Sequence, residues 1–404
     1  MRSLRIKKLT LLVLLSIALT FVLVNLVNAH KEATKRAEVW PAGARLFAAD
    51  NGRGEVVVLD LPDGQVVARI TVPPKVMSMG KTEDGAYVVA MRGRDTDRDY
   101  VTVMASGVES DGMRLPYVAK TLLLGKGMGG IHADHVDTLW GKPFMNSDEE
   151  GKLFRFEQKA LAPEASFAPE VIPLGPPDHF EFLELGENVW ACNLRKGLVR
   201  LIDKQGKDVV TFPCTRFHGS AANAETGRAF FACADCVLVV EDQKEKARIA
   251  YPSAERISYV MEGEGVLIGS GEYGKSIQVL DPKNLTLNPI TLGDKILAKT
   301  TSVDKKHIFL FLQNGNLEVR QGKTGELIHS VAVSTPLSDI VEDVTGAVLP
   351  SIALWENRAY VSLPQWGMIA EVNWAEGKLI RNIMIGGTPS RLVLIGAKAS
   401  PGSR

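Results

Sequence analysis

A self-similar β-repeat constrains the fold of this 404-residue chain more than any other feature of its sequence. The clearest copy runs from Leu46 to Asp60 as two short apolar stretches, turns at Leu61-Pro62-Asp63-Gly64, and continues as a third stretch to Val72. Further copies start, roughly 37 to 51 residues apart, near Val88, Leu139, Val189, Phe230, Leu267, Phe309 and Tyr360. Periods of this length are typical of propeller blades.

A fourth apolar stretch precedes each copy, as Ile257 to Met261 does ahead of Val266. Four strands per unit and radial closure, which leaves no long exposed edge, favour a propeller. A β-helix needs shorter repeats, and a pair of sandwiches does not explain the period. We therefore expect an all-β propeller, a single closed domain within residues 30–404. The count predicts eight blades, or seven if the long spacings before Leu139 and Val189 contain insertions.

The N-terminus predicts export. Basic residues at positions 2, 5, 7 and 8 precede an apolar run over 9–27, and Val27-Asn28-Ala29 matches the small-x-small pattern of a signal-peptidase site. We expect residues 1–29 to be a signal peptide and the mature chain to begin at His30. A run of about 19 residues can also span a bilayer, so an uncleaved anchor is the alternative. Membrane contact is expected only if this segment stays uncleaved.

The balanced charge and the context of one phosphate-loop-like motif argue against nucleic acid and nucleotide as ligands. The 47 basic and 47 acidic residues balance, so no net field attracts nucleic acid. Residues 269–276, Gly-Ser-Gly-Glu-Tyr-Gly-Lys-Ser, match the phosphate-loop pattern, but that mechanism requires a helix directly afterwards. The following Ile277 to Leu280 favours a strand, so we interpret the segment as a hairpin turn and expect no nucleotide.

All four cysteines, Cys192, Cys214, Cys233 and Cys236, lie within two adjacent repeats. In an exported chain an even set of cysteines is more often paired than free, so structural disulfides are the favoured interpretation. The Cys233-x-x-Cys236 spacing also permits a zinc or redox site, although no second such pair completes a four-thiolate centre.

Three histidines occupy matching places in three successive repeats: His132, His179 and His218. The first strand of each propeller blade lines the central channel, so side chains placed in register there converge. Neutral imidazole is a common zinc ligand, and we expect these three to bind one Zn²⁺. His135 or Asp178 is the expected fourth ligand, or else water. Asp134, His135 and Asp178 are also near enough to orient an imidazole.

The alternative is that these histidines only satisfy backbone groups at the channel mouth. His307 and His329 lie elsewhere in the repeat, and we interpret both as surface or structural residues.

Several segments resemble known families. Residues 46–72 resemble the repeats of exported YncE-like propellers. Cys214-Thr-Arg-Phe-His218-Gly219-Ser-Ala-Ala, with the later Phe-Phe-Ala-Cys233-Ala-Asp-Cys-Val-Leu, is similar to the corresponding segment of periplasmic zinc metallochaperone propellers of Azt-type zinc ABC importers. Ile131-His132 resembles that family's Val-His-Phe position, and Asp178-His179 its His-His-Gly position. Together these matches cover about residues 125 to 240.

The chain also departs from that family. Ser220 stands where the family has Glu, Asp178 where it has a second His, and only Asp134-His135 partly replaces its His-rich segment. The resemblance implies a periplasmic zinc-binding protein that carries Zn²⁺ and passes it to the solute-binding protein of a zinc importer. It also implies a bridge between Cys214 and Cys233, which leaves Cys192 and Cys236 as a possible second pair.

Two other functions remain open. A hydrolase or lactonase could use the same metal to activate water, with Asp134, Asp178 or Glu181 as general base. A metal-free interaction propeller would need none of these groups. We expect a carrier and not an enzyme.

Overall fold

The computed structural model describes residues 43–73, 76–92, 99–109, 111–132, 134–252, 255–271, 274–337 and 348–396, with the side chains of Arg92 and His132 excepted. The expected signal segment, residues 1–29, lies outside these ranges. Within them, no helix is both long and apolar enough to cross a membrane.

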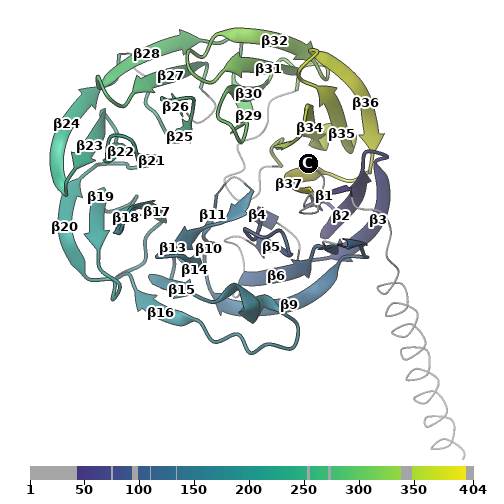
Figure 1. The fold of residues 1–404 in the computed structure, drawn as a ribbon, viewed down its shortest axis with the longest axis horizontal. Coiled ribbons are helices and arrows are strands. Elements are labelled where there is room, and N and C mark those ends of the chain that lie inside the picture. The colour runs from purple at the N-terminus through teal and green to yellow at the C-terminus, as the bar shows by residue number, and fades with distance from the viewer. Residues whose placement is uncertain are drawn as a thin grey trace, which may run out of the picture.

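The strands form a ring of eight blades around a central channel (Figure 1), so the prediction of an eight-bladed propeller is confirmed. Each blade is an antiparallel sheet whose first strand lies innermost. From the channel outwards, blade 1 comprises β37 (Pro389–Gly396), β1 (Ala44–Asp50), β2 (Glu55–Leu61) and β3 (Gln65–Thr71), and blade 2 comprises β4 (Val76–Lys81), β5 (Tyr87–Arg92), β6 (Asp99–Ala105) and β9 (Tyr117–Gly125). Blade 3 comprises β10 (Met128–Gly129), β14 (Lys142–Ser147), β15 (Lys152–Arg155) and β16 (Glu170–Pro173), and blade 4 comprises β17 (Phe180–Leu185), β18 (Asn188–Asn193), β19 (Leu198–Ile202) and β20 (Asp208–Pro213).

The second half of the ring is more regular. Blade 5 comprises β21 (Ser220–Asn223), β22 (Arg228–Ala232), β23 (Cys236–Glu241) and β24 (Lys244–Ala250), and blade 6 comprises β25 (Tyr259–Glu262), β26 (Leu267–Ser270), β27 (Ser276–Asp281) and β28 (Thr286–Thr291). Blade 7 comprises β29 (Ile296–Thr301), β30 (His307–Leu312), β31 (Asn316–Gln321) and β32 (Leu327–Ala332), and blade 8 comprises β33 (Ile352–Trp355), β34 (Arg358–Leu363), β35 (Met368–Asn373) and β36 (Lys378–Met384). Two 3-10 helices, η1 (Gln158–Leu161) and η2 (Pro364–Trp366), and a hairpin of β7 (Val108–Glu109) and β8 (Gly112–Met113) lie in connections.

Burial explains why the second and third strands are the most apolar. Middle strands such as β34 are covered on both faces by neighbouring blades and are buried almost throughout, whereas outer strands such as β24 alternate between exposed and half-buried residues. The core therefore lies between blades: Phe309 and Val319 of blade 7 pack with Val361 and Val372 of blade 8.

The last strand closes the ring. β37 pairs antiparallel with β1, with Phe47 opposite Val393, so the two ends of the described chain share blade 1. Residues from the far ends of the sequence thus complete one sheet, and no blade edge is left open at the seam (Figure 1).

The regular repeat is interrupted after β10. A hairpin of β11 (Ile131–His132) and β12 (His135–Val136) leaves blade 3 and joins blade 2, where β12 runs parallel to β4 with His135 opposite Lys81. β13 (Thr138–Leu139) then returns to pair with β14. His132 consequently lies beside the innermost strand of blade 3, on a hairpin attached to its neighbour.

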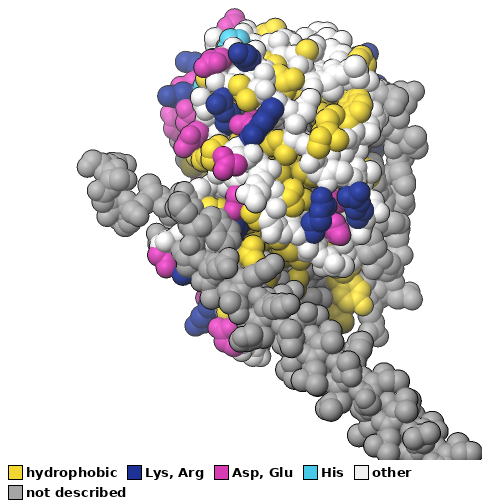
Figure 2. Space-filling model, turned by 90° about the vertical axis from the view of Figure 1, so that its right-hand side faces the viewer, with side chains coloured by type: hydrophobic (Ala, Val, Ile, Leu, Met, Phe, Trp, Pro, Cys, Tyr) yellow, Lys and Arg dark blue, Asp and Glu magenta, His cyan; other side chains and the backbone are white. Residues whose placement is uncertain are grey.

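Two smaller expectations are also resolved. Strands β26 and β27, which flank the segment 269–276, pair antiparallel as the hairpin interpretation expects, and residues 272 and 273 lie outside the described ranges. On the face shown in Figure 2, basic and acidic side chains are interspersed with apolar ones, as the balanced composition implies.

Candidate metal centre

Two histidines and a glutamate meet at the channel side of blades 4 and 5. His179 directly precedes β17, Glu181 is the second residue of that strand, and His218 lies two residues before β21. One potential ligand atom from each lies within 4.8 Å of the others. The two imidazole rings are 5.9 Å apart between centroids and inclined by 35°. The register of the repeat thus does bring His179 and His218 together.

A carboxylate from blade 3 orients His179. The Nδ1 atom of His179 lies 2.7 Å from Oδ2 of Asp148, in the turn between β14 and β15. The other carboxylate oxygen, Oδ1, accepts hydrogen bonds from the backbone N–H of Phe180 at 3.1 Å and from Asn146 Nδ2 at 2.7 Å. A carboxylate oxygen accepts hydrogen bonds, so neutral His179 carries its hydrogen on Nδ1, and Nε2 is its basic nitrogen.

A backbone carbonyl from blade 6 orients His218 in the same way. Its Nδ1 atom lies 2.8 Å from the oxygen of Ser258, just before β25, and a carbonyl can only accept. Nε2 is again the nitrogen with the lone pair. The next residue, Gly219, has φ +94°, and a Cβ atom there would lie 3.0 Å from the Tyr259 Cα. Glycine therefore allows the loop to approach blade 6 closely.

Glu181 connects the two histidine loops. Its Oε2 accepts the backbone N–H of Gly219 at 3.0 Å, and its Oε1 lies 3.4 Å from His218 Nδ1. The side chain is only 12% exposed. Two imidazole nitrogens and one carboxylate oxygen form a donor set that suits zinc. Sequence reasoning named Glu181 only as a candidate base. The usable signal was its position two residues after His179, since alternate residues of an extended chain share a face.

The three residues lie close enough together to share one ion. Zinc bonds of about 2.0–2.1 Å at tetrahedral angles place neighbouring ligand atoms roughly 3.3 Å apart. One ligand atom from each residue already lies within 4.8 Å of the others. Three protein ligands leave one coordination position open.

The structure describes only the backbone of His132, so metal binding by its side chain stays a prediction. His135 and Asp134 form a separate pair, with His135 Nδ1 2.6 Å from Asp134 Oδ1 and Lys81 Nζ 2.9 Å from Oδ2. Burial opposes ionisation of Asp134, but the hydrogen bond from His135 and the charge of Lys81 lower its pKa to about 2. Both carboxylate oxygens are therefore already engaged, and the pair does not join the three-residue cluster.

Asp178 has an architectural position. It is 1% exposed and accepts backbone N–H groups of His179 and Arg195 on Oδ1, both at 2.8 Å. Its Oδ2 accepts Asn193 Nδ2 and the Lys196 backbone N–H, both at 3.2 Å. These bonds fasten the loop that carries His179.

The two remaining described histidines lie away from the cluster. His307 stacks against Trp374 with ring centroids 4.8 Å apart, and His329 lies on the outer strand β32 of blade 7.

Among the cysteines, Cys214 and Cys233 form a disulfide with their Cα atoms 4.9 Å apart, as the family resemblance implied. Cys192 and Cys236 are buried free thiols, so the expected second bridge is wrong. They lie on β18 of blade 4 and β23 of blade 5, which pack face to face. Packed sheets lie about 10 Å apart, beyond the roughly 5.5–6 Å between bridged Cα atoms.

No protein-family model matches the chain. A curated protein, the zinc chaperone AztD of Citrobacter koseri, is 25% identical over 405 residues, which cover 95% of this chain and 93% of that protein. This confirms the resemblance to zinc metallochaperone propellers along almost the whole chain. That relative is named as a chaperone and not as an enzyme, in agreement with the expected class.

Solved structures agree on the fold. The structure of apo AztD from Citrobacter koseri superposes with a TM-score of 0.73 and 23% identity, and the match covers 90% of this chain and 100% of that one. Dihydro-heme d1 dehydrogenase NirN matches with a TM-score of 0.62 and 13% identity, covering 90% of this chain and 76% of that one. Because a dehydrogenase shares the architecture, the fold alone does not assign a function.

Proposed function

We propose that this chain is a periplasmic zinc carrier that binds Zn²⁺ through His179, Glu181 and His218 and passes it to the solute-binding protein of a zinc importer. One observation supports this most strongly: hydrogen bonds to Asp148 and Ser258 fix the orientation of both imidazoles at a cluster that also contains the Glu181 carboxylate. The zinc-chaperone relative supports zinc as the cargo. The resemblance of about residues 125 to 240 to propellers of zinc ABC importer systems supports the importer. The signal-like segment 1–29 supports export.

The arrangement suits a carrier because it combines ordered ligands with access. The His179 and His218 side chains are 28% and 34% exposed, so an acceptor's ligand can reach the metal from the channel. A three-ligand site leaves a fourth position at which that ligand can enter before a protein ligand leaves. On the sequence argument, we propose His132 as the ligand that fills this fourth position until the acceptor's ligand replaces it.

Competition against a chromogenic chelator tests metal binding. The mature protein should take up one zinc ion per chain, and a His179→Ala/His218→Ala double variant should take up none at the same chelator concentration. His329→Ala is the matched control, since it removes an imidazole from an outer strand. Equal uptake by the double variant and the wild type would contradict the proposed site.

Transfer is tested separately. Zinc-loaded protein is mixed with the metal-free solute-binding protein of a zinc importer, and the zinc in the reisolated acceptor is followed over time. Direct hand-off predicts a transfer rate that rises with acceptor concentration and exceeds spontaneous release into excess chelator. A rate equal to spontaneous release would leave a zinc-binding protein without a delivery function.

A further inference from the structure

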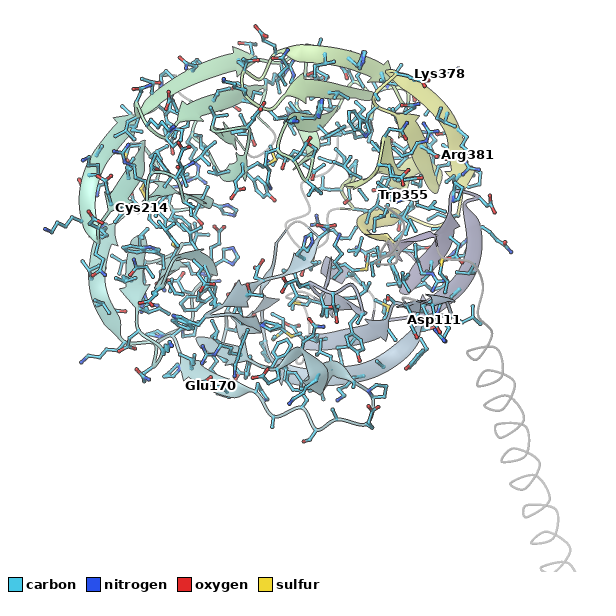
Figure 3. All side chains as sticks on the ribbon, in the orientation of Figure 1. Asp111, Glu170, Cys214, Trp355, Lys378 and Arg381 are labelled. Carbon is cyan, nitrogen blue, oxygen red and sulfur yellow. A yellow bond between two sulfur atoms is a disulfide. The ribbon has the colours of Figure 1, made fainter. Side chains whose placement is uncertain are left out.

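A free thiol lies next to the disulfide. Cys233 and Cys236 face each other across a two-residue turn, where the Cys233 backbone N–H donates to the Cys236 oxygen at 2.9 Å. Arg248 contacts the segments that carry two of the cysteines. It donates to the oxygen of Pro213, the residue before Cys214, at 2.9 Å and lies 3.9 Å from Cys236 Sγ. Cys214, Cys233 and Cys236 belong to one buried cluster between blades 4 and 5, and Figure 3 marks Cys214 there.

The bridge also holds the segment that carries His218. Cys214 begins this segment and His218 ends it, four residues later. Between them, the Thr215 oxygen accepts the Ala234 backbone N–H at 2.7 Å. The His218 backbone N–H donates to the Ala232 oxygen at 3.0 Å. The disulfide is the covalent part of an attachment that joins the metal-binding loop to the hairpin containing Cys233 and Cys236.

We propose that these three cysteines form a thiol–disulfide exchange centre that controls zinc binding, an inference that rests on the proposed function. The Cys236 thiol loses its proton and attacks Cys233 Sγ. The Cys214–Cys233 bond breaks as a Cys233–Cys236 bond forms, and Cys214 leaves as a thiolate that takes up a proton. One disulfide and one thiol are present before and after the step, so no oxidant or reductant is consumed.

The geometry permits both isomers. Cys233 and Cys236 follow the last residue pair of β22 and β23 and are joined by a single backbone hydrogen bond. Opposed residues in antiparallel strands have Cα atoms about 4.5–5.5 Å apart, within the roughly 4.4–6.8 Å range of disulfides. In the Cys233–Cys236 isomer Cys214 is released, and the His218 segment keeps only its hydrogen bonds and the buried Phe217. By linkage, if the exchange weakens zinc binding, bound zinc must favour the Cys214–Cys233 isomer by the same factor.

The exchange is slow. Burial raises the pKa of the Cys236 thiol and Asp235 adds to this effect, while Arg248 opposes it. Because only the thiolate attacks, we expect interconversion on the minutes-to-hours scale of uncatalysed disulfide rearrangement. A zinc-loaded molecule would thus keep its bridge, whereas a molecule left empty for hours would convert.

Disulfide mapping on the wild-type mature protein tests the exchange. Zinc-loaded and chelator-stripped samples are incubated for hours without added thiol, alkylated in denaturant and digested with trypsin. The loaded sample should show peptide 208–216 linked to peptide 229–244. The stripped sample should show Cys214 alkylated and an internal bridge within 229–244. Identical linkages in the two samples would overturn the exchange.

Variants test the coupling to zinc. Cys236→Ser should keep the two peptides linked in both samples. Cys214→Ala should weaken zinc binding by about 10 to 100-fold, as the loss of a group supporting a ligand does. Cys192→Ala, which alters a thiol of the same buried cluster outside the exchange, should bind zinc like the wild type. Full affinity in Cys214→Ala would overturn the coupling.

The mapping needs no variant, so a Cys214→Ala protein that fails to fold leaves the exchange testable. The outcomes also separate the two proposals. If the wild type with its Cys214–Cys233 bridge binds no zinc, the proposed function fails. If it binds zinc but its linkages never change with metal, only the exchange centre fails.

Discussion

Replacing Asp148 by asparagine should weaken zinc binding without unfolding the protein. Asp148 Oδ1 accepts two donors, from Asn146 and Phe180, while Oδ2 accepts His179 Nδ1. An asparagine has one oxygen for these two places. If the oxygen keeps the two donors, the amide nitrogen donates to Nδ1 and the imidazole hydrogen moves to Nε2, the nitrogen needed for zinc.

The structure sets the size of this effect. Zinc binding to the variant requires the amide to turn round, which places its NH₂ group against two donors and breaks two hydrogen bonds. At about 0.5–1.5 kcal/mol each, the cost is about 1–3 kcal/mol. At 1.4 kcal/mol per tenfold, this corresponds to a loss of roughly 5 to 150-fold in affinity. The metal-free variant avoids this cost, so its thermal stability should change little.

The assay is chelator competition at pH 7.5, combined with thermal unfolding of the metal-free proteins. Asp203→Asn is the matched control, because Asp203 Oδ1 likewise accepts two hydrogen bonds, both from backbone N–H groups in a turn of blade 4, and neither bond involves a histidine. The reasoning is refuted if Asp148→Asn binds zinc within a factor of two of the wild type, or if Asp203→Asn weakens binding equally.

Three further results are expected. Glu181→Gln should lower zinc affinity at least tenfold, because an amide is a poor zinc ligand. The loss of stability should be small, because the amide oxygen can still accept the Gly219 N–H. Chelator competition and thermal unfolding check these two effects, and unchanged affinity would contradict the prediction. Thiol titration of denatured protein should find two thiols, and a count of zero or four would contradict the bonding pattern. In native protein at pH 8 the thiols should react slowly, since burial raises the pKa of both Cys192 and Cys236 and so lowers their thiolate fractions. Zinc affinity should fall as the pH is lowered, because imidazole coordinates only when neutral; a titration flat from pH 8 to 5.5 would argue against histidine ligands.

The fold was predictable because each blade is specified locally. Apolar middle strands, Gly-containing turns and a period matching one blade recur along the chain, and closure by β37 follows once eight units are counted. His179 and His218 were predictable for the same reason, since each lies within two residues of the start of the innermost strand of its blade.

The rest of the site depends on contacts between blades, which no local pattern encodes. Asp148 reaches His179 from a blade 3 turn, and Glu181 reaches Gly219 across the boundary between blades 4 and 5. The hairpin β11–β12 takes His132 out of the repeat register by pairing with blade 2. The unpaired Cys192 and Cys236 reflect the distance between packed sheets, which cysteine spacing does not reveal.

The most direct measurement is a crystal structure of the zinc-loaded mature protein with anomalous data collected on both sides of the zinc absorption edge. We expect one strong zinc peak in the channel between blades 4 and 5, about 2.0–2.1 Å from Nε2 of His179, Nε2 of His218 and a carboxylate oxygen of Glu181. A zinc peak that contacts neither histidine, or a fully zinc-competent protein whose crystals show no metal at this position, would contradict the assignment.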